Sequence, residues 1–280
     1  MSPQLPPERA PHWLGQQWRR LRRTLARRPR AGAIVFQGDY PSWEAARQAS
    51  SGYDAQLILQ RTREAVLKVK RGEAAYERDS VLFNQVQHAF PVLAGLLRAA
   101  TASEGRLCVL DFGGALGSSY FQCREFLKPV KRLEWLVVEQ PAHVACGRRD
   151  LQTEQLRFYE TVESCLSLHA PNVLLLSSVL PYLPQPYTML EQLLKTGIAH
   201  VIIDRTPFLR RAGERLTVQT VPASIYPASY PAWFFSEEKL LQALTRRGYG
   251  LVAEFPVLIR LAPEDEPADW KGFIFEKVSS

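Results

Sequence analysis

The sequence lacks any long apolar run. No stretch approaches the roughly 18 continuous apolar residues that a membrane-spanning helix requires. The first residues also lack the apolar core of a secretory signal. Both absences argue against a membrane or secreted protein, so we expect a cytoplasmic one.

Cysteine and histidine are scarce, with four and five among the 280 residues. The cysteines stand far apart, form no Cys-x-x-Cys pair and have no histidine cluster beside them: Cys108, Cys123, Cys146 and Cys165. This spacing argues against a zinc site and against a disulfide framework. We expect buried, reduced thiols and no metal.

The excess of positive over negative charge is confined to the beginning of the chain. The net charge is +7, and residues 1–30 supply all of it through eight arginines against one acid. The remaining chain has 27 basic and 27 acidic residues. A domain without excess positive charge offers little attraction to a phosphate backbone, so we expect no nucleic-acid partner.

Residues 1–31 form a basic tail in which apolar residues recur at helical spacing with arginines between them: Trp13, Leu14, Trp18, Leu21 and Leu25. One interpretation is an amphipathic helix that rests on anionic lipid. The alternative is a solvated, partly disordered leader. Because one short basic helix binds membranes weakly, we expect at most weak contact with a membrane surface.

Residues 32–105 have the pattern of an N-terminal helical cap. Ser42 is a suitable N-cap for a first helix, and a second helix is predicted over about 54–70. A third is predicted from about Tyr76 onward, kinked or restarted at Pro91.

From residue 106 to 280 the pattern changes to short, apolar, β-rich runs separated by helical stretches or turns. The predicted strands are 107–112, 133–140, 156–160, 172–178, 199–205, 251–255 and 272–278. Such an alternation is typical of an α/β protein with a doubly wound, seven-stranded, mostly parallel sheet. Pro207 is expected to end the fifth strand, before an aromatic and proline-rich insert over 206–235 that is too long for an ordinary loop.

A glycine-rich turn follows the first of these strands. Asp111 ends the strand, the turn contains Gly113, Gly114 and Gly117, and a helix is expected to begin near Ser118. Glycines let a ligand approach the backbone closely, and a helix N-terminus offers free N–H groups. Both a dinucleotide and S-adenosylmethionine (SAM) use such a turn.

Charge favours SAM over a dinucleotide at this turn. Phe112 occupies the first glycine position of a dinucleotide fingerprint, and Asp111 would face a pyrophosphate of like charge. SAM instead carries an ammonium and a sulfonium group, which a carboxylate attracts. We therefore expect SAM as the cofactor.

Further cofactor contacts are predicted where the next strands end. Glu139 follows the second strand at the distance of a ribose-binding acid, and Gln140 stands beside it. Glu160, after the third strand, is a candidate for the adenine amino group, and Ser177 ends the fourth strand. Each of these residues is also compatible with an ordinary solvated strand end.

Several segments together resemble a known family: VLDFGGALGSSYFQ, WLVVEQP, LLLSSVLPYL, IIDRTPF and QTVPASIYPASYPAWFF. They are similar to an uncharacterised bacterial family classed as SAM-dependent methyltransferases, over about residues 38–255. The resemblance implies a class I, Rossmann-like methyltransferase fold with SAM at the carboxyl ends of the first four strands. Members often occur beside genes for surface polysaccharide synthesis. The resemblance implies no substrate and no catalytic base.

The candidate catalytic residues follow the fourth and fifth strands. Asp204 is suited to accept a proton, Arg205 to hold an anionic substrate, and Tyr182 to line the pocket. The alternatives are an ion pair for the first two and simple packing for the tyrosine. We expect methyl transfer to a small-molecule or carbohydrate acceptor, for example in surface polysaccharide synthesis. The alternative is a non-catalytic SAM-binding or adaptor protein with the same fold. The sequence does not predict the oligomeric state.

Overall fold

The central strands form where the sequence is most apolar. The structure, a computed structural model, describes residues 33–52, 55–78, 80–259 and 261–278. Five neighbouring strands of its main sheet are parallel: β4 (Arg106–Phe112), β5 (Arg132–Val138), β6 (Leu156–Tyr159), β7 (Val173–Ser177) and the first half of β8 (His200–Leu209). The basic tail, and with it the predicted membrane contact, lies outside the described residues.

Two antiparallel strands complete the sheet. These are β11 (Tyr249–Pro256) and β12 (Ala268–Lys277), and the strand order is β11-β12-β8-β7-β4-β5-β6. The prediction of a doubly wound, seven-stranded, mostly parallel sheet is confirmed. Because β4 has β5 on one side and β7 on the other, the chain changes direction across the sheet beside β4.

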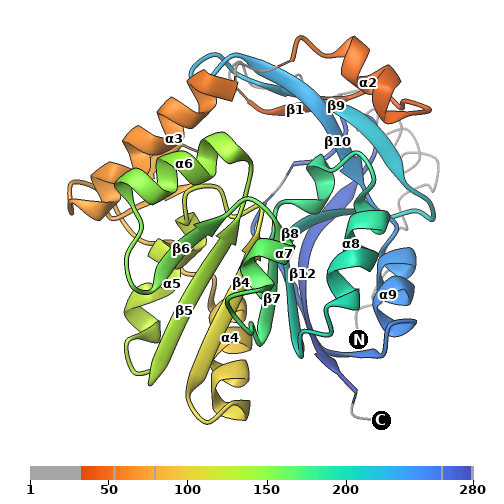
Figure 1. The fold of residues 1–280 in the computed structure, drawn as a ribbon. Coiled ribbons are helices and arrows are strands. Elements are labelled where there is room, and N and C mark those ends of the chain that lie inside the picture. Colours follow the sequence, from red (N-terminus) through yellow and green to blue (C-terminus); the bar gives the residue numbers. More distant parts are fainter. Residues whose placement is uncertain (1–32, 53–54, 79, 260, 279–280) are drawn as a thin grey trace, which may run out of the picture. The chain divides into compact units, whose positions relative to one another are not determined.

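Helices cover both faces of this sheet (Figure 1). One face packs against α4 (Phe90–Ala102), α5 (Ser118–Leu127) and α6 (Pro141–Asp150). The other packs against α7 (Val162–Leu166), α8 (Pro186–Lys195) and α9 (Glu237–Thr245). The central strands therefore bury both of their faces, which explains why their runs are apolar throughout rather than alternating.

The N-terminal region contains strands as well as helices. Ser42 caps α2 (Trp43–Ala49), accepting a hydrogen bond from the Ala45 N–H at 3.2 Å, and α3 spans Ala55–Lys70, as predicted. The prediction of a helix from Tyr76 is wrong. Residues there form a hairpin of β2 (Tyr76–Arg78) and β3 (Val81–Phe83). A stack of Tyr76 on Phe83 at 5.7 Å supports the cross-strand pairing.

Pro91 explains why the helix begins late. It lies in the first turn of α4, where its missing N–H has no partner to lose. A helix continuing from Tyr76 through this position would lose that hydrogen bond and strain its backbone. The described residues between 33 and 105 thus form a mixed α and β region, and a domain boundary at residue 105 stays a prediction.

The predicted insert 206–235 is a β-structure. The prediction that Pro207 ends the strand is wrong, because β8 continues to Leu209 while the Pro207 carbonyl accepts from the Phe235 N–H at 3.0 Å. Two further strands follow, β9 (Arg215–Val221) and β10 (Ala228–Phe234), and β9 also pairs with β1 (Val35–Gln37). We call this three-stranded antiparallel sheet β1-β9-β10 the inserted sheet.

The helix α2 covers one face of the inserted sheet, where Ala46 packs with Leu216 and Val218. Because side chains alternate along a strand, Gln219, which follows Val218 in β9, lies on the opposite face of the inserted sheet, away from α2. Among the described helices, none is long and apolar enough to cross a membrane.

A stability test follows from the packing of α6 on β6. A Cβ added at Gly147 would lie 2.5 Å from the ring of Phe158, and a buried ring has little room to move. We expect G147A to lower the free energy of unfolding by about 1–3 kcal/mol. In G250A the new atom would meet the exposed Val278 at 3.3 Å and the Glu276 carbonyl at an ordinary 3.9 Å, so we expect a change within about 0.5 kcal/mol. Urea denaturation of both variants measures the difference, and equal losses would contradict this account of the α6 contact.

Candidate functional site

The candidate site lies at the carboxyl edge of the sheet, where the connections after β4 and β7 diverge. Ligands of open α/β sheets bind at such a switch point. The two connections touch there, because a Cβ added at Gly113 would collide with Val179. Gly113 has φ +73°, and its N–H donates to the Val138 carbonyl at 2.9 Å. Only glycine satisfies both the positive φ and the close approach.

Asp111 is a buried carboxylate beneath the glycine turn. It is 1% exposed, and its Oδ2 accepts a hydrogen bond from Trp135 Nε1 at 2.9 Å. Its Oδ1 has no hydrogen-bond partner among the described residues. A Cβ on Gly114 would lie 2.5 Å from this carboxyl group, so the glycine is needed to admit it. The result is a carboxylate held in place by one donor and lacking another.

The electrostatics of Asp111 follow from its burial. Burial raises the pKa of the carboxyl to about 7, while the Trp135 hydrogen bond and Arg205 act to lower it and Glu139 to raise it. Asp111 is therefore partly protonated near neutral pH in the free protein. A cationic ligand would favour the ionised form.

Glu77 is a second carboxylate at the turn, and the sequence pattern did not assign it to the site. It is 2% exposed, accepts a hydrogen bond from Ser118 Oγ at the start of α5, and lies 3.3 Å from the Ser80 N–H, which also donates to it. The sequence pattern placed this residue near the start of a predicted helix. Nothing in a single sequence indicates that a hairpin brings this acid to residue 118.

Glu139 and Gln140 lie at the end of β5, as predicted. The Glu139 carboxylate accepts from the Gln140 N–H at 2.7 Å, and it is close enough to Asp111 to act on its pKa. Glu160 is exposed after β6, beside Thr161, which caps α7. Their roles with ribose and adenine stay predictions.

Ser177, Asp204 and Arg205 are brought together at the ends of β7 and β8. Ser177 Oγ donates to Asp204 Oδ2 at 2.9 Å, and Arg205 Nε donates to Ser177 Oγ at 3.3 Å. Arg205 Nε also lies 3.6 Å from Asp204 Oδ2, and Asp204 is 6% exposed. The ion pair that the sequence left as one alternative is thus present, and Asp204 already accepts a hydrogen bond.

Backbone strain gathers at the same edge. Ala115, Ser178 and Arg205 have φ values of +49°, +58° and +51°, which disfavour any residue with a Cβ. Ala115 lies in the glycine turn, Ser178 follows β7, and Arg205 lies within β8. Strained residues persist where the surrounding structure holds them for function. Of the five described non-glycine residues with positive φ, three therefore lie at this edge, and the other two are Ser80 and Glu104.

Tyr182 connects the inserted sheet to the site. It ends the 3-10 helix η1 (Leu180–Tyr182), and its hydroxyl donates to Gln219 Oε1 at 2.9 Å. Gln219 Nε2 donates in turn to the Tyr230 hydroxyl at 3.2 Å, and the two tyrosine rings meet edge to face at 5.6 Å. Tyr182 is therefore part of a polar cluster and also packs against the apolar cluster of Leu209 and Phe234.

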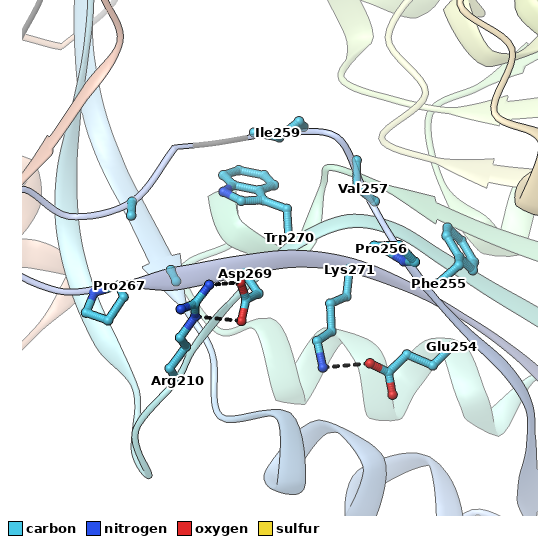
Figure 2. A pocket seen from close by; sticks show the side chains of 12 residues that line it. Arg210, Glu254, Phe255, Pro256, Val257, Ile259, Pro267, Asp269, Trp270 and Lys271 are labelled. Carbon is cyan, nitrogen blue, oxygen red and sulfur yellow. Dashed lines mark hydrogen bonds and ion pairs between the residues drawn. The ribbon is translucent and has the colours of Figure 1, made fainter. Parts of the chain in front are cut away.

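Two cavities lie elsewhere. One, of about 770 Å³, lies against β11 and β12 (Figure 2), and its charged side chains are paired as Arg210 with Asp269 and Lys271 with Glu254. The other, of about 600 Å³, lies at β6. Neither is lined by the glycine turn, so cavity size does not locate the site. In the part of the chain that the structure describes, no group of three or more metal-ligating side chains occurs.

Comparison with known proteins gives only structural similarity. No protein-family model and no curated protein sequence matches the chain. Magnesium protoporphyrin IX methyltransferase from Synechocystis PCC 6803, solved with bound SAM, is 13% identical over 81% of this chain and 99% of its own, with a TM-score of 0.44. An amino pentose methyltransferase from Micromonospora echinaspora, also SAM-bound, is 12% identical over 68% and 90%, with a TM-score of 0.42.

The fold class rests on the sheet itself. The order β6-β5-β4-β7-β8-β12-β11, with β12 the strand that runs antiparallel to its neighbours, is that of a class I methyltransferase fold. This agrees with the fold that the sequence resemblance implies.

A test of the buried carboxylate follows from its pKa. The ordinary value of 3.8 rises to about 7 in the folded protein. Between these pH values the folded protein keeps a proton that the unfolded chain loses, so Asp111 lowers stability increasingly as pH rises. We expect D111N, which keeps an acceptor for Trp135, to raise the melting temperature at pH 8 by roughly 3 °C or more and to change it little at pH 4.

Thermal unfolding across this pH range measures the effect, with the exposed Glu160 changed to Gln as a control. A D111N variant no more stable than the wild type at pH 8 would contradict the assignment of a buried, destabilising charge.

Proposed function

We propose that this protein is a SAM-dependent methyltransferase. The observation that carries the proposal is the buried Asp111 carboxylate with an unpartnered Oδ1 at the glycine turn. Leaving a buried polar atom unpaired costs about 1–3 kcal/mol, and a ligand that donates to it would recover that loss. The ammonium group of SAM supplies both the donor and the positive charge.

A dinucleotide fits the same turn poorly. Its pyrophosphate would approach the N-terminus of α5, where the Glu77 carboxylate already accepts from Ser118. Asp111 would add a second like charge. NAD is therefore the rival cofactor that the charges disfavour.

The remaining cofactor contacts are proposed by position. Gly113, Gly114, Gly117 and Ser118 would border the amino-acid end, and Glu139 with Gln140 the ribose. Glu160 would lie near the adenine and Ser177 near the sulfonium. Their common location at the carboxyl edge supports this set.

The acceptor is proposed to be a small molecule or a carbohydrate. Tyr182, Gln219 and Tyr230 offer hydroxyl and amide groups beside aromatic rings, a combination that suits a hydroxylated ring. A role in surface polysaccharide synthesis accords with the family that the sequence resembles. Asp204 and Arg205 would position the acceptor, and much of the catalysis would come from alignment for in-line transfer.

A second candidate function is a SAM-binding adaptor without catalysis. It is favoured by the hydrogen bond and ion pair that already engage Asp204, the best-placed base. Incubation with methyl-labelled SAM and extracts rich in cell-wall precursors and nucleotide sugars distinguishes the two. Label in a small acceptor supports the enzyme, and binding without transfer supports the adaptor.

Calorimetry of the whole chain with SAM, S-adenosylhomocysteine and NAD tests the cofactor. We expect both sulfur compounds to bind and NAD to bind much more weakly. We expect D111N and E139Q each to weaken SAM binding about 10-fold or more, because each removes a charge-assisted hydrogen bond. E163Q, at an exposed position of α7, serves as a control and should bind as the wild type does. Binding of NAD alone would exclude the proposal.

The pH dependence of binding gives a separate test. Because the pKa of Asp111 is raised to about 7 by burial and a bound cation would lower it, binding releases a proton. We expect the affinity for SAM to rise about 10-fold from pH 6 to pH 8. D111N should lack this rise over the same range. A flat wild-type profile would remove Asp111 from the cofactor site.

A further inference from the structure

The helix α5 begins without a cap of its own. Its N-cap residue is Gly117, with φ +87° and no side chain to accept from the first N–H groups. The partial positive charge of a helix N-terminus favours an anion there. In this chain the anion comes from far away in the sequence, because Glu77 of β2 accepts from Ser118 Oγ.

Several contacts fix Glu77 in this place. The Ser80 N–H donates to Glu77 at 3.3 Å, and Ser80 has φ +69°, a strained value for serine. Ser80 Oγ also forms a hydrogen bond with Thr62 Oγ1 of α3 at 3.0 Å. The hairpin is therefore tied to both α3 and α5, with a buried carboxylate at the junction.

A second, independent observation points to a ligand beside Glu77. Asp111, at the other end of the glycine turn, is buried and has an unpartnered Oδ1. Two buried carboxylates thus bracket the turn of five residues, 113 to 117, that contains three glycines. A cation bound at this turn would favour the ionised form of either carboxylate.

We propose that Glu77 is a specificity-determining residue of the cofactor site that receives the ammonium group at the amino-acid end of the cofactor. The inference rests on the proposed function and deepens it. Glu77 places a carboxylate where a dinucleotide would place its phosphate, so the same side chain recognises the amino acid and excludes the pyrophosphate. The hairpin β2–β3 is then part of the cofactor site rather than only a cover for α5.

Calorimetry with two ligands tests this role. S-Adenosylhomocysteine has the amino-acid end, and 5′-methylthioadenosine has the same nucleoside and sulfur without it. We expect E77Q to weaken S-adenosylhomocysteine binding about 10-fold or more and to change methylthioadenosine binding less than about 2-fold. E73Q removes an exposed charge from the same segment and should leave both affinities unchanged.

The outcomes separate the two proposals. Wild-type protein that binds neither ligand defeats the proposed function and this inference together. Wild-type binding with an equal loss of both ligands in E77Q overturns the inference alone, because Glu77 then only supports the fold of the turn. Unchanged affinities in E77Q also overturn it. If circular dichroism shows that E77Q does not fold, E77D decides by the same comparison, since it keeps the charge but shortens its reach.

Discussion

The hydrogen bond from the Trp135 indole to Asp111 joins the core of the sheet to the candidate site. Trp135 is among the largest fully buried side chains, so the donor cannot move without disturbing the packing of β5. The indole N–H binds Oδ2 of Asp111, and Oδ1 is left without a hydrogen-bond partner among the described residues. The glycines follow from this, because a side chain at residue 114 would strike the carboxyl group. The position of the turn is thus set by a buried acid.

Such an arrangement lowers the stability of the free protein. A buried carboxylate with half of its acceptors unpaired is unfavourable, and strained residues at Ala115, Ser178 and Arg205 add to the loss. The two apolar clusters on either face of the sheet supply the compensating burial. The division is spatial, since the apolar packing lies along the strands and the unfavourable groups lie at their carboxyl ends.

The sheet could be predicted from the sequence because burial on both faces leaves continuous apolar runs, as in 107–112 and 172–178. The glycine turn was equally visible, since its residues are adjacent in the chain. The hairpin at 76–83 was not, because its polar residues and short length suit a helix start as well. The inserted sheet was missed for another reason. Pro207 indicates a strand end, yet β8 continues to Leu209, and the Pro207 carbonyl accepts a hydrogen bond from the Phe235 N–H. Contacts between distant segments, such as Glu77 with Ser118 and Tyr182 with Gln219, leave no periodic signal.

The pairing of β1 with β9 has a consequence for how the molecule is assembled. Its register places Val35 beside Thr220. β1 can therefore pair only with a strand that lies about 180 residues later in the sequence. Contacts of such sequence separation close slowly, because chain entropy must be lost before they form. The parallel strands can pair with β4 and β5 before β1 completes the inserted sheet. We therefore expect β1 to join the inserted sheet after the local β9–β10 hairpin has formed.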